Sequence, residues 1–452
     1  RERCYDDGYT AAEHAAAYTR YFRQWAGKRA ATGIWIEIGS NGYQKYSWPA
    51  LFNLHELAPD PLIRKRYGML LDFAFIEEAQ ISVRGRRGGG RSRAYGGRGD
   101  FESYKNLLYA PKGQPALGSH SNVIETSRYQ LPAAAILLRF RKIPASEPFV
   151  IYNRVLGELE STPATGEKGQ RFAADSALIN YAYRTPHYLL GSTLQDPSLT
   201  LPDPESERKA VWKYSGISRQ NRWCGMIFDD PESDKFSGVY PVIAKTRGGR
   251  PQHSFWSVQH QNVIILQRIA PQTRKRMGSY STGAISIRFD GLDLERVEEK
   301  NWIFANNGKA YIAVKFLDGS YKWMENRKEA APAELNQLSD TSRVILHAGD
   351  VSTHSSFEQF RRQVLSGRLT VTPNKVDYVY GPADTRLGVT LFNVENPECF
   401  ELPEVNNMPI ELRPTTTWQS PYLNGQFGSE VIMVTVGSIK QVLDFTTGAN
   451  AQ

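Results

Sequence analysis

Residues 191–210, GSTLQDPSLTLPDPESERKA, separate two halves of the chain that have different sequence patterns. This stretch is rich in Pro, Asp and Ser, which is typical of a connector rather than of a helix or a strand. Segments with helical periodicity come before it, and short runs of β-branched and aromatic residues come after it. We therefore expect two domains, a helical one over residues 1–205 and an antiparallel β-sandwich over residues 206–452.

The first half predicts a series of helices. Residues 11–30 are Ala-rich, and Asp60 followed by Pro61 is a typical helix start, with an N-cap side chain and a proline in the first turn. The stretch after Pro61 keeps apolar residues at helical spacing to about residue 82. Further helices are expected over residues 47–58, 131–143, 147–160 and 173–190. The long polar links between them are places where binding residues tend to lie.

The second half predicts strands and turns. Residues 255–268, 284–289 and 310–316 are rich in β-branched and aromatic residues, and Asn306-Asn307-Gly308 and Asp318-Gly319 are typical of hairpin turns. Later strands are expected over residues 343–347, 376–380, 387–393 and 430–436, with a short helix over 355–366. Many strands without alternating helices favour an antiparallel sandwich. The expected fold class is therefore α+β and multidomain.

Composition restricts the class of partner. The 452-residue chain is 40% hydrophobic, which is enough to bury large cores, and its formal net charge of +8 favours an anionic partner. Its 23 Tyr and 9 Trp suit the flat apolar faces of sugars, although such rings are also ordinary core residues. No apolar run is long enough to span a membrane, and no signal peptide is visible. Because the chain starts at Arg1, we expect that an upstream segment has been removed and that the protein is periplasmic or secreted.

Several enzyme classes lack their motifs here. The sequence has no HExxH, CxxC or GxSxG, and no Walker loop or GxGxxG that follows a strand. His253 and His260 are seven residues apart, so on one strand they would face opposite sides and could not form a metal pair. We therefore expect no metal and no cofactor, and neither a nucleotide enzyme nor a common hydrolase.

Two segments of the first half combine ligand-type residues with glycine. Residues 33–48, GIWIEIGSNGYQKYSW, place Trp35, Asn41 and Tyr43 in a turn that enters a helix, which suits a hydroxylated or anionic ligand, or else a capped loop with packed tyrosines. Residues 84–98, RGRRGGGRSRAYGGR, hold six Arg and six Gly. They fit a nucleic-acid segment, a solvated loop, or a loop whose Arg91 and Arg93 pair with carboxylates or sulfates of a polymer. Because the segment lies between expected helices and not in a long disordered region, nucleic acid is the less favoured partner.

Three further segments carry residues suited to proton transfer or anion binding. Residues 117–129, LGSHSNVIETSRY, place His120 and Asn122 close together in a polar loop. Arg184 and Tyr188 lie at the end of the last expected helix, and His253 precedes the first clear strand of the second half.

The arrangement resembles the polysaccharide lyases that join an α/α toroid to an antiparallel β-sandwich, the heparinase II/III-like and alginate-lyase-like group. The resemblance is carried by residues 33–75, by GGGRSRAYGG and YRTPHYLLGSTLQD, and by a sandwich that opens near RPQHSFWSVQHQN. In that group a W-x-E…Y…Y segment enters a toroid helix, and a His-bearing strand closes over the cleft. This chain departs from two of the group's motifs, with SHSN at 119–122 and His253-Ser254-Phe255 in their places. The helical half is also short, so an incomplete toroid is expected.

The resemblance implies β-elimination at a uronic acid. Asn41 or Asn122 with Arg91 or Arg93 would neutralise the carboxylate, which makes the neighbouring C–H proton more acidic. Proton transfer would fall to side chains drawn from Tyr43, His120, Tyr188 and His253. Trp35 and Arg184 would help to bind an anionic polysaccharide. A glycoside hydrolase that uses two of Glu37, Asp100 and Glu125, and a non-catalytic glycan-binding protein, remain alternatives. No membrane partner is expected.

Overall fold

The computed structural model describes most of the chain. The described residues are 7–34, 44–92, 107–109, 122–140, 148–155, 158–159, 171–172, 178–195, 222–229, 236–243, 255–268, 285–291, 295–324, 328–332, 342–392 and 400–451.

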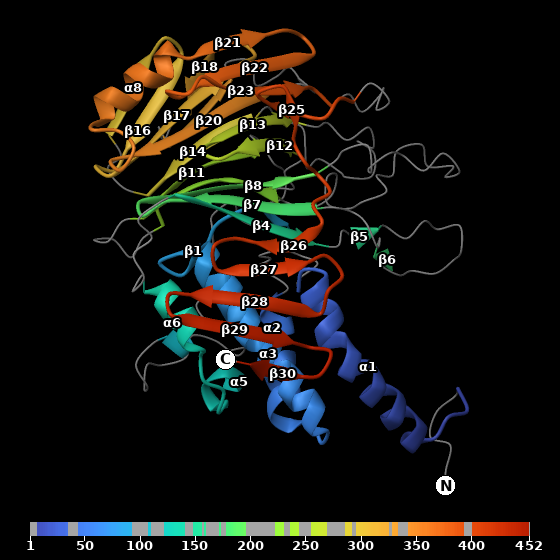
Figure 1. Ribbon diagram of the computed structural model, residues 1–452. Helices are drawn as coiled ribbons and strands as arrows, with labels where there is room; N and C mark the ends of the chain where they lie inside the picture. Colours follow the sequence, from blue (N-terminus) through green and yellow to red (C-terminus); the bar gives the residue numbers. More distant parts are fainter. Residues whose placement is uncertain are drawn as a thin grey trace.

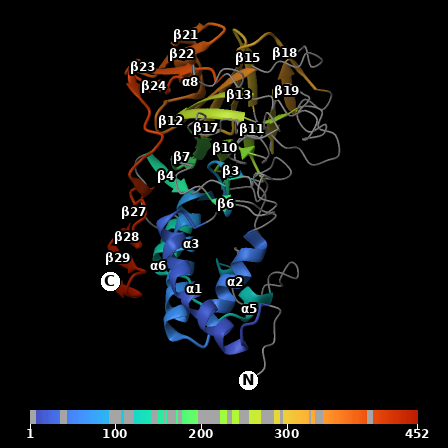
Figure 2. The ribbon, with the colours of Figure 1, turned by 90° about the vertical axis from the view of Figure 1, so that its right-hand side faces the viewer.

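Helices and sheets occupy opposite ends of the molecule (Figures 1 and 2). The helical end contains α1 (Ala11–Ala31), α2 (Gln44–Leu57), α3 (Pro61–Ile81), α5 (Asn122–Thr126) and α6 (Ala133–Arg139), with the 3-10 turn η1 (Leu107–Tyr109). Three antiparallel sheets are stacked at the other end, and one of them continues down beside the helices (Figure 1).

The largest sheet has 13 strands and joins distant parts of the sequence. Its order is β18 (Tyr321–Trp323), β19 (Glu329–Pro332), β14 (Ile285–Asp290), β11 (Gly238–Ile243), β10 (Gly225–Phe228), β8 (Tyr188–Leu194), β7 (Leu178–Arg184), β4 (Phe149–Val155), β26 (Thr416–Gln419), β27 (Leu423–Gln426), β28 (Val431–Val436), β29 (Ile439–Asp444) and β30 (Ala449–Ala451). Strands from both sides of residue 205 therefore share one sheet.

The other sheets stack on the first. A six-stranded sheet has the order β12 (Phe255–His260), β13 (Val263–Arg268), β20 (Arg343–Asp350), β17 (Ala310–Phe316), β16 (Trp302–Asn306) and β15 (Glu295–Glu299). A five-stranded sheet has the order β21 (Arg368–Val371), β22 (Lys375–Tyr380), β23 (Thr385–Thr390), β24 (Glu404–Val405) and β25 (Met408–Pro409), and α8 (Phe357–Ser366) packs beside it. Short ribbons pair β1 (Ser82–Val83) with β2 (Arg86–Arg87), β3 (Arg91–Ser92) with β9 (Arg222–Trp223), and β5 (Glu158–Leu159) with β6 (Arg171–Phe172).

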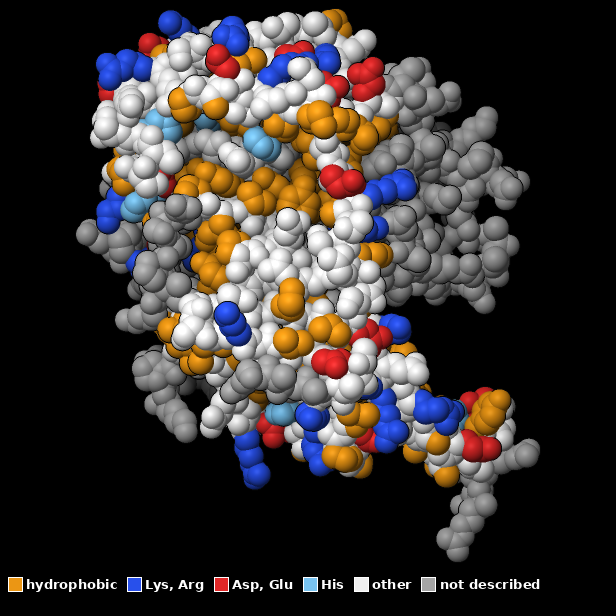
Figure 3. All heavy atoms as spheres, viewed as in Figure 1, with side chains coloured by type: hydrophobic (Ala, Val, Ile, Leu, Met, Phe, Trp, Pro, Cys, Tyr) orange, Lys and Arg blue, Asp and Glu red, His pale blue; other side chains and the backbone are white. Residues whose placement is uncertain are grey.

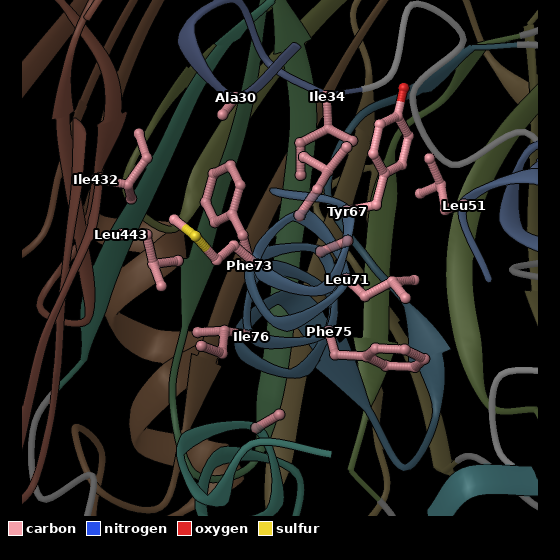
Figure 4. Close-up of a cluster of buried hydrophobic side chains, with 14 of the residues drawn as sticks. Ala30, Ile34, Leu51, Tyr67, Leu71, Phe73, Phe75, Ile76, Ile432 and Leu443 are labelled. Carbon is pink, nitrogen blue, oxygen red and sulfur yellow. The ribbon is translucent and has the colours of Figure 1, made fainter. Parts of the chain in front are cut away.

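The three largest apolar cores hold these layers together. One lies between the 13-stranded and six-stranded sheets, as in a sandwich, and a second lies between the six-stranded sheet and the layer formed by the five-stranded sheet and α8. The third surrounds α3, whose Phe73 and Ile76 lie toward Ile432 and Leu443 of the sheet and whose Leu71 and Phe75 lie toward the other helices (Figure 4). The last strands of the chain thus cover the helices.

Several sequence predictions are confirmed. The chain is α+β with large antiparallel sheets, α1 and α3 match the expected helices, and the Asp60 carboxylate accepts hydrogen bonds from the backbone N–H groups of Leu62 and Ile63. Asn306-Asn307-Gly308 forms the turn between β16 and β17. The described helices, however, are too few to make the expected α/α toroid.

Some expected elements were wrong. Residues 147–160 and 173–190, expected as helices, contain β4, β7 and the start of β8. Of the helix expected over 131–143, residues 133–139 form α6, and residues 141–143 lie outside the described residues. Valine, isoleucine and tyrosine are frequent in β4 and β7, and tertiary pairing in the middle of the sheet fixes them as strands. Asp318-Gly319 forms no hairpin, because β17 and β18 belong to different sheets. Residues 191–194 of the expected connector lie in β8.

No described helix combines the length and the apolar character that a membrane crossing requires.

Candidate functional site at the junction of helices and sheet

The described part of the Arg/Gly segment, residues 84–92, lies where α3 meets the large sheet. α3 ends at Ile81, and the chain then makes the β1–β2 ribbon, with Arg84 and Gly85 at positive φ in its turn. After Gly88–Gly90 it forms β3, which pairs with β9. Ile81 and Val83 share an apolar core with Ala182 of β7 and Leu189 of β8 in the large sheet. The described part of the segment is therefore packed into the junction.

Glycines allow the backbone of this segment to lie directly on the sheet. A Cβ atom at Gly89, where φ is +74°, would lie 2.6 Å from Oδ1 of Asn180, and one at Gly90 would lie 2.2 Å from Oγ1 of Thr193. From the sheet side, a Cβ at Gly191 would lie 2.2 Å from Cα of Gly89. The glycine run is therefore explained by close packing, since no side chain fits between the two backbones.

Two of the four described arginines in this segment, Arg84 and Arg87, pair with carboxylates of the protein. Nη1 of Arg87 donates hydrogen bonds to Glu77 at 2.7 Å and to Glu78 at 2.6 Å, and all three residues are buried. Burial alone would lower the pKa of Arg87, but the charges of the two glutamates outweigh it and raise the pKa. Arg84 pairs with Asp229 at 2.7 Å. Residues 85–91 are buried, so the interpretation as a solvated basic loop is wrong for them. Arg84 and Arg87 are already paired with acids of the same chain, and their charges are not free for a polymer.

A row of buried residues crosses the sheet beneath the glycines. Thr193, Asn180, Asn153 and Trp418 are successive cross-strand neighbours on β8, β7, β4 and β26, and each is at most 5% exposed. Within the described part of the chain, neither amide atom of Asn180 has a hydrogen-bond partner, and Oδ1 of Asn153 has none. Buried amides normally form hydrogen bonds, so these amide atoms are exceptions, and the backbone of Gly89 packs directly over Asn180.

Residues that adjoin predicted site residues contact both ends of this polar row. Ser92, which precedes Arg93, pairs with Arg222. β12, which begins two residues after His253, is bound to the end of β8, because Oγ of Ser257 donates to the Thr193 carbonyl at 2.7 Å. At the other end of the polar row, Nε1 of Trp418 donates to the carbonyl of Ala30 at 3.0 Å. Ala30 lies near the end of α1, five residues before the predicted site residue Trp35.

The three predicted site residues whose side chains are described are all buried. Arg91 is 1% exposed, and its guanidinium lies 5.1 Å from the centre of the Trp223 ring. Arg184 donates hydrogen bonds to the carbonyls of Ala79, at 3.2 Å, and Gln80, and so caps the last turn of α3. These contacts give both arginines structural roles at the junction.

Tyr188 lies in the core between the two larger sheets and is 2% exposed. Burial raises the pKa of its hydroxyl well above the ordinary value, with smaller contributions from Tyr183 and Asp350. A buried neutral hydroxyl among apolar side chains fits a packing role and not a proton-transfer role.

The structure separates Asn122 from Arg91. Asn122 begins α5, whose following residues Ser127 and Arg128 donate hydrogen bonds to Glu56 near the end of α2. Figure 2 shows α5 near the lower end of the helices, whereas β3, which carries Arg91, lies above them. The side chain of Asn122 lies outside the described residues, as do Trp35, Asn41, Tyr43, Arg93, His120 and His253.

A second polar cluster lies beside α5, and the sequence reasoning missed most of it. The Tyr129 hydroxyl donates to Asp72 at 2.8 Å, and the His55 ring lies 5.8 Å from that of Tyr129. Burial raises the pKa of Asp72 to about 6, although the Tyr129 hydrogen bond and His55 act in the opposite direction. Gly68 accommodates the His55 ring, because a Cβ there would lie 2.9 Å from it. A glycine inside a helical pattern was the only sequence signal for this contact.

Within the described ranges, no three His, Cys, Asp or Glu side chains are placed to hold a metal ion. Comparisons with protein-family models, with curated proteins and with solved structures give no significant match for this chain.

Proposed function

We propose that the protein is a polysaccharide lyase that cleaves an acidic, uronic-acid-containing polysaccharide by β-elimination at the junction between the helices and the large sheet. The observation that supports this most directly is the convergence of loop attachments there. Gly90, three residues before Arg93, and Ser257, four residues after His253, both lie against Thr193, and Ala30, five residues before Trp35, contacts Trp418 at the other end of the same polar row. We also propose that the described helices are part of an α/α toroid.

The proposed chemistry needs three functions near one sugar. A donor must neutralise the uronate carboxylate, a base must remove the proton on the adjacent carbon, and an acid must protonate the leaving oxygen. We assign carboxylate binding to Arg93 and Asn41, and proton transfer to Tyr43 or His253. Arg91 is a positioning residue in this scheme, because its contact with Trp223 fixes the ribbon that leads to Arg93.

The first test is chemical. Elimination creates a conjugated double bond, so incubation with alginate, glucuronan, glycosaminoglycans and ulvan should increase ultraviolet absorbance with at least one polymer. New reducing ends without absorbance would indicate a glycoside hydrolase. If none of these polymers changes, the lyase proposal fails.

The second test separates binding from structure within one segment. Arg93→Gln should weaken binding of the cleaved polymer and reduce its dependence on salt, because one charged contact is lost. Arg84→Gln is the matched control, since Arg84 is already paired with Asp229 and its side chain is 39% exposed. Equal effects of the two substitutions would show that the polymer does not contact Arg93 specifically. Tyr43→Phe should lower turnover much more than binding, and full activity of this variant would exclude Tyr43 as the base.

A further inference from the structure

A second polar and aromatic surface lies on the sandwich, away from the junction. Tyr181 and Tyr183 project from β7 on the face opposite the glycine segment, and Tyr152 of β4 is the cross-strand neighbour of Tyr181. The rings of Tyr152 and Tyr181 meet edge to face with centres 5.0 Å apart. Side chains of the hydrophobic class, which includes tyrosine, gather at the level of β7, β8 and β12 on the face shown in Figure 3.

The β12–β13 hairpin borders these tyrosines. The Gln261 N–H donates to the Tyr181 hydroxyl at 3.0 Å, and Nδ1 of His260 lies 2.8 Å from the Tyr380 hydroxyl. Gln261 is exposed at the tip of the hairpin and has φ of +48°, which is uncommon for a residue other than glycine. Asn262 anchors the turn by donating to the Ala348 carbonyl at 2.7 Å. The hairpin tip is therefore held in one position beside β7.

Hydrogen-bonding groups on this surface remain available. Within the described part of the chain, the hydroxyls of Tyr152 and Tyr183 have no hydrogen-bond partner, and both residues are half-buried. Since Nδ1 of His260 is used by Tyr380, its Nε2 is left for another group, and the Gln261 side-chain amide is also exposed. Two aromatic edges and four polar groups thus border one surface.

The charge of this surface is low. Burial raises the pKa of Tyr152 and of Tyr183 to about 12, so both hydroxyls stay neutral at ordinary pH. Burial also lowers the pKa of His260, which favours its neutral form. The nearby charges are acidic, because Glu411 and Asp350 add to the shifts of Tyr152 and Tyr183. Among the described residues, no Lys or Arg forms an ion pair or ring contact with these side chains.

We propose that Tyr152, Tyr183, His260 and Gln261 form a binding site for an uncharged saccharide. A sugar ring has an apolar face that suits a tyrosine ring and a rim of hydroxyls that can exchange hydrogen bonds with phenol, imidazole and amide groups. An anionic polymer fits poorly, because the neighbouring charges are acidic. The site does not depend on the lyase proposal, which concerns the junction.

Affinity electrophoresis of the full chain tests this site. Gels that contain soluble xylan, mixed-linkage glucan or galactomannan should retard the wild-type protein with at least one polymer. Tyr183→Ala should weaken that retardation about ten-fold, since a ring contact and a hydrogen bond are both lost, and Tyr183→Phe about three-fold. Tyr18→Ala, which removes a 60% exposed tyrosine from α1, is the matched control and should bind like wild type.

The outcomes separate the possibilities. Wild-type binding to none of the neutral polymers would overturn the proposal, as would retention of full affinity by Tyr183→Ala and His260→Gln. Loss of polyuronate binding in these variants, without loss of neutral-polymer binding, would assign the surface to an anionic chain and reject the proposal. Ultraviolet absorbance with uronate polymers should not change in Tyr183→Phe, which keeps this test independent of the junction.

Discussion

His347 should make the sandwich sensitive to acid. It belongs to β20 of the six-stranded sheet, and its side chain is 2% exposed in the layer between this sheet and the five-stranded sheet. Its Nδ1 lies 2.9 Å from the hydroxyl of buried Tyr378 on β22. Burial lowers the pKa of His347 from 6.5 to about 3, and the nearby His354 adds to this shift. In the folded protein the ring is therefore neutral throughout the range in which a solvent-exposed histidine becomes charged.

The sign and size of the effect follow from proton binding. Below pH 6.5 the unfolded chain binds a proton at His347 that the folded chain does not. The contribution of His347 to the free energy of unfolding is therefore fully present above about pH 6.5 and is lost as pH falls toward 3. One pKa unit corresponds to about 1.4 kcal/mol, so moving from about pH 7.5 to about pH 4.5 should lower the free energy of unfolding by about 2.7 kcal/mol through this residue alone.

Urea unfolding at a series of pH values, for wild type and for His347→Gln, measures this contribution. Glutamine keeps a group that can hydrogen-bond the Tyr378 hydroxyl but does not titrate, so other acid-sensitive groups cancel in the comparison. The difference in stability between the two proteins should therefore shrink by about 2.7 kcal/mol between about pH 7.5 and about pH 4.5. A difference that stays constant with pH would refute the buried neutral histidine.

Three other substitutions test the helical end and its junction. Arg87→Met should destabilise the protein by about 3–5 kcal/mol, because two buried carboxylates lose their partner, and a change in the thermal midpoint of less than a degree would contradict this. Gly89→Ala should destabilise the protein far more than Gly308→Ala. Both glycines have positive φ, but a Cβ at Gly89 would clash with Asn180 and one at Gly308 meets open space. Equal decreases in the thermal midpoint would show that packing is not the cause. Tyr129→Phe removes the hydrogen bond to Asp72 and should raise the pKa of that carboxyl above 6, which carboxyl NMR titration can follow. An unchanged value would mean that the hydrogen bond does not form.

The parts of the fold that the sequence predicts are those with strong local signals. The Asp60-Pro61 start and the periodicity of α3 act within a few residues, and the Asn-Asn-Gly turn between β16 and β17 does so too. β4 and β7 were expected as helices because apolar and aromatic residues predominate on both of their faces. A strand that is buried on both sides has no clear alternation, and only its neighbours in the sheet define it.

The candidate site was predictable only in outline. The Arg/Gly segment stood out by composition, but its partners Glu77, Glu78 and Asp229 lie on α3 and after β10, and no spacing pairs them with the segment. Tyr188 was chosen for its chemistry, and the sheet pairing that buries it is a long-range property. The asparagines of the polar row were missed because Asn153 and Asn180 lie in two segments that were both expected as helices. Only the pairing of β4 with β7 in the sheet brings the two side chains together.

The paired arginines change what the net positive charge can mean. If Arg84 and Arg87 are neutralised by acids of the same chain and Arg91 is buried against Trp223, then these residues cannot provide the main attraction for an acidic polymer. Their role is to hold α3, the ribbon and the sheet in one arrangement. Any attraction for a polyuronate must then come from cations outside this packed core, of which Arg93 is the nearest in sequence. Salt-dependent binding that survives Arg93→Gln without change would therefore count against a substrate path at the junction, even if the protein cleaves the polymer.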